Sequence, residues 1–142
     1  MKTLQQLSLF LENKPAALAA PIQALADAGV NIYTLSVADT SAFGVLRLLV
    51  RDAPAAQRIL AEKGFAGVLT DVVAVAVDDK PGSLAKILAL LAARDVNVEY
   101  MYAFAGFREG KAALVFRFRD PVDALSKIGA ELALLDESDV FD

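Results

Sequence analysis

The sequence predicts an α+β protein made of two similar domains, each an antiparallel sheet with helices on one face. The chain has 142 residues, enough for one ordinary domain or two small ones, and its hydrophobic fraction of 56% can fill a core. A set of motifs recurs at an offset of 66 residues. Within each copy, short apolar strands alternate with helical segments.

The repeat extends through most of the chain. Residues 7–37 match residues 73–103, and residues 46–52 match residues 114–120 at a slightly larger offset of 68. We therefore predict two domains, residues 1–70 and residues 71–142. The matched motifs are Lys14-Pro15 with Lys80-Pro81, Val30-Asn31 with Val96-Asn97, and Arg51-Asp52 with Arg119-Asp120.

The first helix of each copy is predicted from a start signal and an apolar stripe. Pro15 and Pro81 suit the first helical position, which needs no backbone N–H donor. Behind them, Leu and Ile recur at the spacing of one helix face. Pro21 would lie at the seventh position of the first helix, where it removes a backbone hydrogen bond, so we expect a bend there. Second helices are predicted over residues 53–63 and 121–129.

Apolar or alternating segments predict four strands in each copy. The resulting order, βαββαβ, is the ferredoxin-like plan, in which two helices cover one face of an antiparallel sheet. The segment from Val72 to Val77 is apolar throughout, and strands apolar on both faces are usually buried on both. We therefore expect the open sheet face to meet another sheet or a second subunit, as in a homodimer. The predicted strands are residues 5–12, 30–37, 45–51 and 66–70, then 72–78, 96–104, 112–119 and 131–135.

Composition limits the chemistry. The chain has no histidine and no cysteine, which excludes thiol nucleophiles, disulfides, Ser-His-Asp relays and the common zinc ligands, and we expect no metal or other cofactor. A net charge of −4 gives no electrostatic footprint for nucleic acid or for an anionic membrane surface.

Membrane insertion and export are not expected either. Mean hydropathy is high, at +0.47. However, the longest apolar run, Ile87 to Ala93, is far shorter than the roughly 18 to 20 residues that span a bilayer. Residues 1–13 lack the pattern of a signal peptide, so a cytoplasmic location is expected.

These motifs resemble the ACT domain, a small regulatory βαββαβ module that binds amino acids in many relatives. In each copy an Asn or Asp precedes Lys-Pro, a Leu-rich helix follows, and a Val-Asn-Ile or Val-Asn-Val strand comes next. The whole chain resembles the stand-alone bacterial proteins made of two tandem ACT domains. The ACT pattern has Gly after the Pro, which Gly82 satisfies and Ala16 does not. The closer resemblance lies in residues 7–14, 70–73 and 99–102.

An amino acid ligand would use specific features of these motifs. Its carboxylate would bind the unpaired amides at a helix start, and its ammonium would bind Asn or Asp oxygens. The resemblance implies that the loop of one domain faces a strand of its neighbour, pairing loop 79–84 with residues 31–36 and loop 13–18 with residues 97–102. The candidate ligand residues are Asn13, Lys14, Ala16, Ala17, Leu18, Asn31, Ile32, Asp79, Lys80, Pro81, Gly82, Ser83, Leu84, Asn97, Val98, Tyr100 and Tyr102.

Each motif also has a purely structural interpretation. The Lys-Pro pairs are typical of turns that start helices, and Asn31 and Asn97 suit turns before strands. Tyr100, Tyr102 and Phe104 alternate as core aromatics do. The acidic segment 136–142 is expected to be a solvated end.

Three classes of function remain. The first is a non-enzymatic regulatory protein that binds an amino acid between its domains and changes its association with itself or with a partner enzyme. The second is an oligomerisation module with degenerate ligand sites. Ala16 favours this class for the first copy, whereas Gly82 argues against it for the second. The third is an enzyme using Lys, Tyr or carboxylates, for which no pair of residues shows distinctive spacing.

Overall fold

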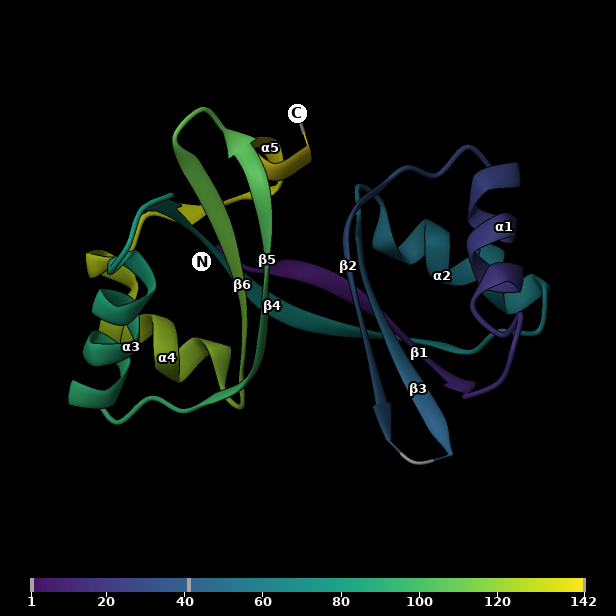
Figure 1. The fold of residues 1–142 in the computed structure, drawn as a ribbon, viewed down its shortest axis with the longest axis horizontal. Coiled ribbons are helices and arrows are strands. Elements are labelled where there is room, and N and C mark those ends of the chain that lie inside the picture. Colours follow the sequence, from purple (N-terminus) through teal and green to yellow (C-terminus); the bar gives the residue numbers. More distant parts are fainter. Residues whose placement is uncertain (1, 41, 142) are drawn as a thin grey trace. The chain divides into compact units, whose positions relative to one another are not determined.

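The computed structural model describes residues 2–40 and 42–141, and these divide into two compact units (Figure 1). One unit, here the N-unit, comprises residues 5–70 together with Phe141. The other, the C-unit, comprises residues 2–4 and 71–140. Each unit is described by itself.

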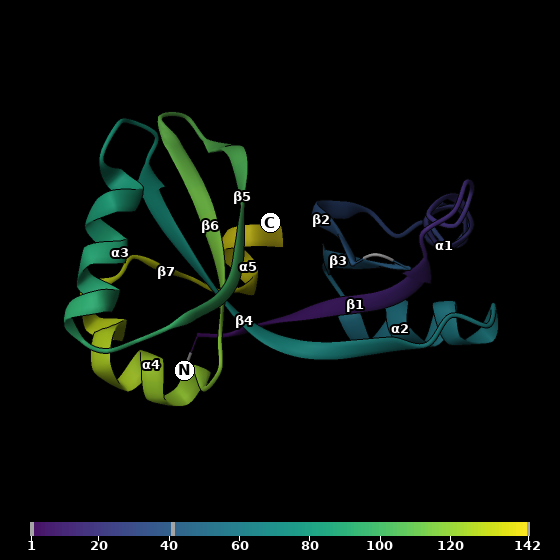
Figure 2. The same cartoon turned by 60° about the horizontal axis from the view of Figure 1, so that its bottom comes forward.

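The N-unit is a four-stranded antiparallel sheet with two helices on one face (Figure 2). Its sheet order is β2-β3-β1-β4. Leu7 of β1 lies opposite Leu48 of β3, and both belong to a core that α1 and α2 cover. The elements are β1 (Leu4–Glu12), α1 (Ala19–Asp27), β2 (Ile32–Thr40), β3 (Phe43–Val50), α2 (Ala53–Glu62) and the start of β4 (Gly67–Asp78).

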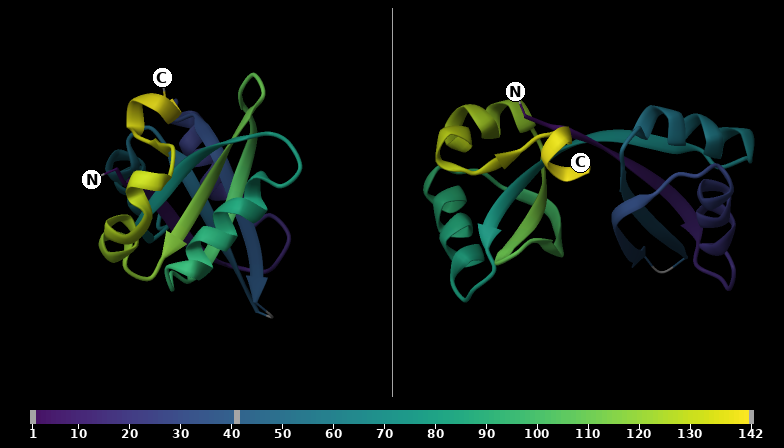
Figure 3. Two further views of the ribbon diagram at one scale, coloured as in Figure 1. Left: turned by 90° about the vertical axis from the view of Figure 1, so that its left-hand side faces the viewer. Right: turned by 90° about the horizontal axis from the view of Figure 1, so that it is seen from above.

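The C-unit repeats this plan, with sheet order β7-β4-β6-β5 and helices α3 and α4 on one face (Figure 3). The predicted βαββαβ order is therefore confirmed in both copies. The division between the units falls inside β4, which is one continuous strand. Its first part is the last strand of the N-unit, and its second part is the first strand of the C-unit, where it lies between β7 and β6. The further elements are α3 (Ser83–Ala93), β5 (Val98–Arg108), β6 (Lys111–Phe118), α4 (Pro121–Ile128), a 3-10 turn (Gly129–Glu131), β7 (Leu134–Leu135) and α5 (Glu137–Phe141).

The second helix of each unit starts with the same device. Asp52 accepts a hydrogen bond from the Ala55 amide at 3.0 Å, and Asp120 accepts one from the Asp123 amide at 3.0 Å. Aspartate is a preferred N-cap, and in both helices a proline in the first turn gives up an N–H that has no helical partner. The repeated Arg-Asp motif therefore marks the start of α2 and of α4.

The first helix of each unit starts later than predicted. Helix α3 begins at Ser83 rather than at Pro81, and the delay is greater in the N-unit. Helix α1 begins at Ala19 rather than at Pro15, so Pro21 lies in its first turn. The first-turn amides have no helical acceptor, so Pro21 removes no hydrogen bond and the predicted bend is wrong. The repeat supplies the reason for the late start. Pro21 corresponds to Ile87, and a helix that began at Ala17, as α3 begins at Ser83, would need an amide hydrogen at Pro21.

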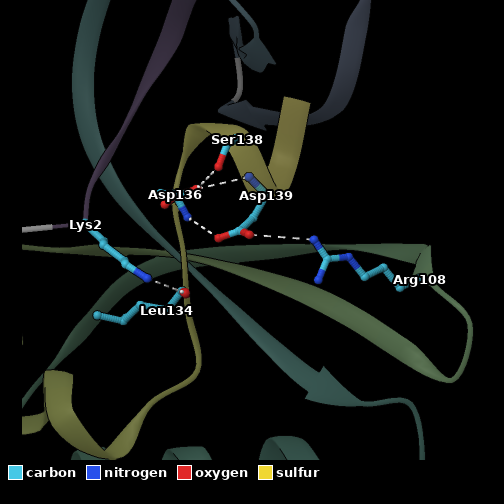
Figure 4. A network of polar contacts seen from close by, with 6 residues as sticks. All are labelled: Lys2, Arg108, Leu134, Asp136, Ser138 and Asp139. Carbon is cyan, nitrogen blue, oxygen red and sulfur yellow. Dashed lines mark hydrogen bonds and ion pairs between the residues drawn. The ribbon is translucent and has the colours of Figure 1, made fainter. Parts of the chain in front are cut away.

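The prediction that the acidic segment 136–142 is a solvated end is wrong for its described residues. Residues 137–141 form α5, and Val140 and Phe141 are only 7% and 5% exposed. In the C-unit, the Asp136 carboxylate accepts bonds from the Ser138 hydroxyl at 2.7 Å and the Asp139 amide at 3.0 Å (Figure 4). The Asp136 amide donates to the Asp139 carboxylate at 2.9 Å, and Arg108 lies 3.7 Å from that carboxylate. The Ser138 hydroxyl, followed by the Asp139 amide, lowers the pKa of Asp136.

Across the part of the chain that the structure describes, no helix is long and apolar enough to cross a membrane.

Candidate functional site

Loop 79–84 connects β4 to α3 and ends in a left-handed glycine. Gly82 is the N-cap of α3, with φ of 92°, and a Cβ atom added there would meet no atom within 4 Å. Within the described chain, no side chain caps this helix. The first-turn amides of α3 carry the partial positive charge of a helix start. The loop therefore presents an uncapped helix end beside a backbone position with no side chain.

Loop 13–18 follows the same path. The Asn13 amide donates to the Ala42 carbonyl at 3.1 Å, as the Asp79 amide donates to the Gly110 carbonyl at 2.9 Å. Ala16 occupies the position of Gly82 and keeps a left-handed φ of 69° despite its methyl group. The two loops thus share their main-chain bonds up to the left-handed residue. They differ in the side chains at that residue, at Asn13 against Asp79 and at Ala17 against Ser83.

Lysines surround the start of α3. The Lys80 ammonium lies 3.9 Å from the Asp78 carboxylate, and Lys111 hydrogen-bonds to the same carboxylate. The Lys111 hydrogen bond and its charge lower the pKa of Asp78, and Lys80 and Lys86 add to this effect. Lys80, Ser83 and Lys86 line an open cavity of about 270 Å³. In the other loop, Lys14 pairs with Glu12 at 3.1 Å.

The candidate asparagines lie at the other end of each sheet from these loops. Asn13 bonds to Ala42, just before β3, whereas Ile32, next to Asn31, lies opposite Val50 at the end of β3. At about 3.3 Å per residue, the two ends of this strand are roughly 23 Å apart. The C-unit repeats the arrangement at the two ends of β6. Within a single unit, therefore, the loop and the asparagine do not form one site.

Each asparagine lies instead in a pocket beside the Arg-Asp motif. The N-unit pocket has a volume of about 250 Å³ and the C-unit pocket about 260 Å³. The repeat alignment already matched the two Arg-Asp motifs, but sequence reasoning assigned them no role at a site. The first pocket is lined by Gly29, Val30, Asn31, Tyr33, Arg51, Asp52 and Ala55. The second is lined by Asp95, Val96, Asn97, Phe118, Arg119, Asp120, Asp123 and Ala124.

The tyrosines of β5 lie on the sheet face away from the helices. Met101 pairs with Phe116, which belongs to the core under α3 and α4, whereas Tyr100 pairs with Arg117 and Tyr102 with Val115. Because side chains alternate along a strand, Tyr100 and Tyr102 point to the opposite face. Both are half-buried there, outside the core that α3 and α4 cover.

The fold and the two equivalent loops define a tandem pair of small ferredoxin-like domains. A family model described as the ACT domain pair matches residues 2–140, and the chain belongs to this family. The resemblance seen in the motifs is thereby confirmed. ACT domain pairs are typically regulatory and ligand-binding. The candidate ligand residues occupy the loops and strands described above.

Solved structures share this fold. Protein BT0572 from Bacteroides thetaiotaomicron is 35% identical and has a TM-score of 0.90; the alignment covers 99% of this chain and 96% of that one. The regulatory subunits of aspartate kinase from Thermus thermophilus, in ligand-free form, and from Thermus flavus are each 20% identical, with TM-scores of 0.61 and 0.59. These alignments cover 92% of this chain and 93% and 92% of the two subunits, and they show the shared fold. No curated protein matches the chain.

Proposed function

We propose that this protein is a non-enzymatic regulator that binds an amino acid at the interface between ACT domains. Binding would change its association with a second copy or with a partner enzyme, because a ligand that prefers one association state shifts the equilibrium toward it. The observation that carries the proposal is the left-handed, side-chain-free Gly82 beside the uncapped start of α3.

The proposed chemistry follows from what a free amino acid offers. Its carboxylate would accept bonds from the first-turn amides of α3 and from the Ser83 hydroxyl, with Lys80 and Lys86 nearby. Its ammonium would bind the Asp79 carboxylate. Residues 31–36 of a neighbouring domain would contact its side chain.

The loop containing Ala16 supports a weaker second site. The Ala16 methyl group occupies the place where Gly82 has no side chain. In addition, α1 begins three residues after Ala16, whereas α3 begins directly after Gly82. We therefore assign the main site to loop 79–84 and expect loop 13–18, with residues 97–102, to bind more weakly.

One observation favours the alternative of an oligomerisation module. Phe10 and Phe43 are 66% and 52% exposed, and the register places them on the sheet face away from α1 and α2. Phe10 lies opposite Val45, two residues from Phe43, so the two aromatic rings form one apolar patch. Such a patch suits a homodimer contact whether or not a ligand binds.

A thermal-shift screen of the purified chain against each of the twenty amino acids tests the proposal. We expect one or a few to raise the melting temperature with the concentration dependence of specific binding. Gly82→Val should abolish this rise, because its side chain fills the approach to the helix start. A chain that is folded but responds to no amino acid would overturn the proposal and leave the oligomerisation module.

The matched control is Gly64→Val. Gly64 has a φ of 89°, and a Cβ atom there would also meet nothing within 4 Å, so both variants carry similar backbone strain. Gly64→Val should therefore lower stability comparably and keep the ligand response. A response lost equally in both variants would show that backbone strain, not the site, is responsible.

A further inference from the structure

The cavity beside α3 has two carboxylates in its lining, and a cation outside the lining binds each of them. Lys111 hydrogen-bonds to the Asp78 carboxylate, and the Arg94 guanidinium donates to the Glu131 carboxylate at 2.7 Å. The charges of both carboxylates are therefore balanced before the lysines that line the cavity are considered.

Lys80 and Lys86 bring two further positive charges to this cavity. The Lys80 ammonium lies 3.9 Å from the Asp78 carboxylate, which Lys111 already binds. Among residues 2–40 and 42–141, no carboxylate forms an ion pair with Lys86. The cavity thus has surplus positive charge, which is complementary to an anionic ligand.

Polar and apolar groups in this cavity suit a small molecule with charged ends. Ser83 and Lys86 are three residues apart in α3, so their side chains are neighbours on one face of the helix. Val75, Val77 and Leu132 add apolar residues to the lining. The volume of about 270 Å³ is below the roughly 300 to 1,000 Å³ of pockets for drug-sized ligands, so the cavity suits a smaller molecule.

We propose that the ligand of the loop 79–84 site is an acidic amino acid, whose side-chain carboxylate binds Lys86. This inference rests on the proposed function, since it names the ligand class of the same site. The α-carboxylate binds the first-turn amides of α3 and the Ser83 hydroxyl, and the ammonium binds Asp79. The methylene groups of the side chain remain available to residues 31–36 of a neighbouring domain. Lys86 then determines specificity, because only a charged side chain supplies it with an ion-pair partner.

The N-unit lacks the groups that this preference needs. Ala20 stands at the position of Lys86, and Ala17 stands at the position of Ser83. The weaker second site at loop 13–18 should therefore not distinguish an acidic amino acid from its amide.

The test is isothermal titration calorimetry of the full chain with L-glutamate and L-aspartate, each compared with its amide, L-glutamine or L-asparagine. The amide keeps the size and shape of the acid and removes only the charge. We expect at least one acid to bind about tenfold more tightly than its amide, because a charge-assisted hydrogen bond is stronger than a neutral one. Lys86→Gln should weaken binding of the acid about tenfold and leave binding of the amide unchanged.

Control variants separate the charge of Lys86 from its effect on folding. Lys86→Arg keeps the charge and should keep the preference for the acid. Lys127→Gln removes another lysine of the C-unit, which pairs with Asp123 at 3.2 Å, and should change neither affinity. Lys86 is exposed, so its replacement should leave the fold intact. Should Lys86→Gln fail to fold, Lys86→Met takes its place, because it also removes the charge and keeps an unbranched side chain.

Two outcomes overturn the inference and leave the proposed function standing. If amino acid binding depends on Gly82 but neither acid binds more tightly than its amide, the ligand is not acidic. If the preference for the acid survives in Lys86→Gln, another group recognises the charge. A folded chain that binds none of the twenty amino acids overturns the proposed function and this inference together.

Discussion

The two lysine-proline loops make the same main-chain bonds and differ at three side chains, of which one stands at the left-handed residue. Asn13 and Asp79 make the same main-chain bond to the neighbouring hairpin, yet Ala16 stands where Gly82 does. A left-handed alanine costs roughly 1–2 kcal/mol, so the loop's own hydrogen bonds and the rest of the unit must offset that cost. The comparison shows that loop 13–18 keeps the left-handed conformation of loop 79–84, although alanine disfavours it.

The two cores differ in the same way, with one plan built from different side chains. Leu46, Leu48 and Val50 fill the N-unit core from β3. The corresponding C-unit positions in β6 are Leu114 and a pair of phenylalanines, Phe116 and Phe118, stacked at 5.5 Å. The C-unit therefore places more of its buried volume in two rigid rings.

The largest expected effect tests this difference between cores. Phe116→Ala should lower the free energy of unfolding by about 3–5 kcal/mol, because it leaves a cavity and removes a stacked ring. Leu48→Ala, at the corresponding N-unit position, should cost less. Urea denaturation measures both values. An equal or larger cost for Leu48→Ala would show that the aromatic pair does not set the C-unit apart.

The capping aspartates should behave alike in the two units. Asp52→Ala and Asp120→Ala each remove one N-cap bond of 3.0 Å and should each cost about 1 kcal/mol. The same denaturation measurement applies, with Asp52→Asn and Asp120→Asn as controls that keep a capping oxygen. A clear inequality between the two alanine variants would break the equivalence of these helix starts.

Exchanging the left-handed residues should have opposite effects of about 1 kcal/mol or less, because the left-handed strain of alanine is partly offset by the greater chain entropy that glycine loses on folding. Ala16→Gly relieves the strain of φ 69° and should raise stability, while Gly82→Ala introduces that strain and should lower it. Melting temperatures of the two variants and the double variant check this. If Ala16→Gly destabilises the chain, the loop is held by contacts of the methyl group rather than by main-chain bonds.

The smallest effect concerns the ion pair between Lys111 and Asp78. Phe43 stands in the N-unit where Lys111 stands in the C-unit. The Lys111 hydrogen bond holds the pKa of Asp78 below its ordinary value of 3.8, so the pair stabilises the fold above that pH, and its contribution is lost as the pH falls through the lowered pKa. Lys111→Gln should raise the pKa of Asp78.

Carboxyl-carbon NMR titration would measure this change. Lys80→Gln is the control and should raise the pKa of Asp78 less, because Lys80 is a smaller cause of the shift. An Asp78 pKa that does not respond to Lys111→Gln would show that other groups determine it.

Motifs and periodicity predicted the fold well because local signals and the repeat agreed. The lysine-proline pairs, the apolar stripes and the strand patterns all pointed to the same βαββαβ order. The late start of α1 escaped prediction because Pro15 and Pro21 each suit a first turn, and only the left-handed Ala16 shows which one the chain uses.

The pocket beside Asn31 depends on tertiary structure. The Arg-Asp repeat was visible, but its proximity to Asn31 comes from the antiparallel pairing of β2 and β3. Long-range pairing of this kind has no signature in residue spacing.

Strand β4 has a consequence for whether the two copies can be separated. Domain boundaries usually fall in exposed, flexible linkers, where few contacts cross. Here the last strand of one module and the first strand of the next are the same continuous strand, Gly67–Asp78. Any break within it would leave both sheets with an incomplete strand and an exposed edge. Neither copy can therefore be excised at this boundary without cutting a strand that both sheets use.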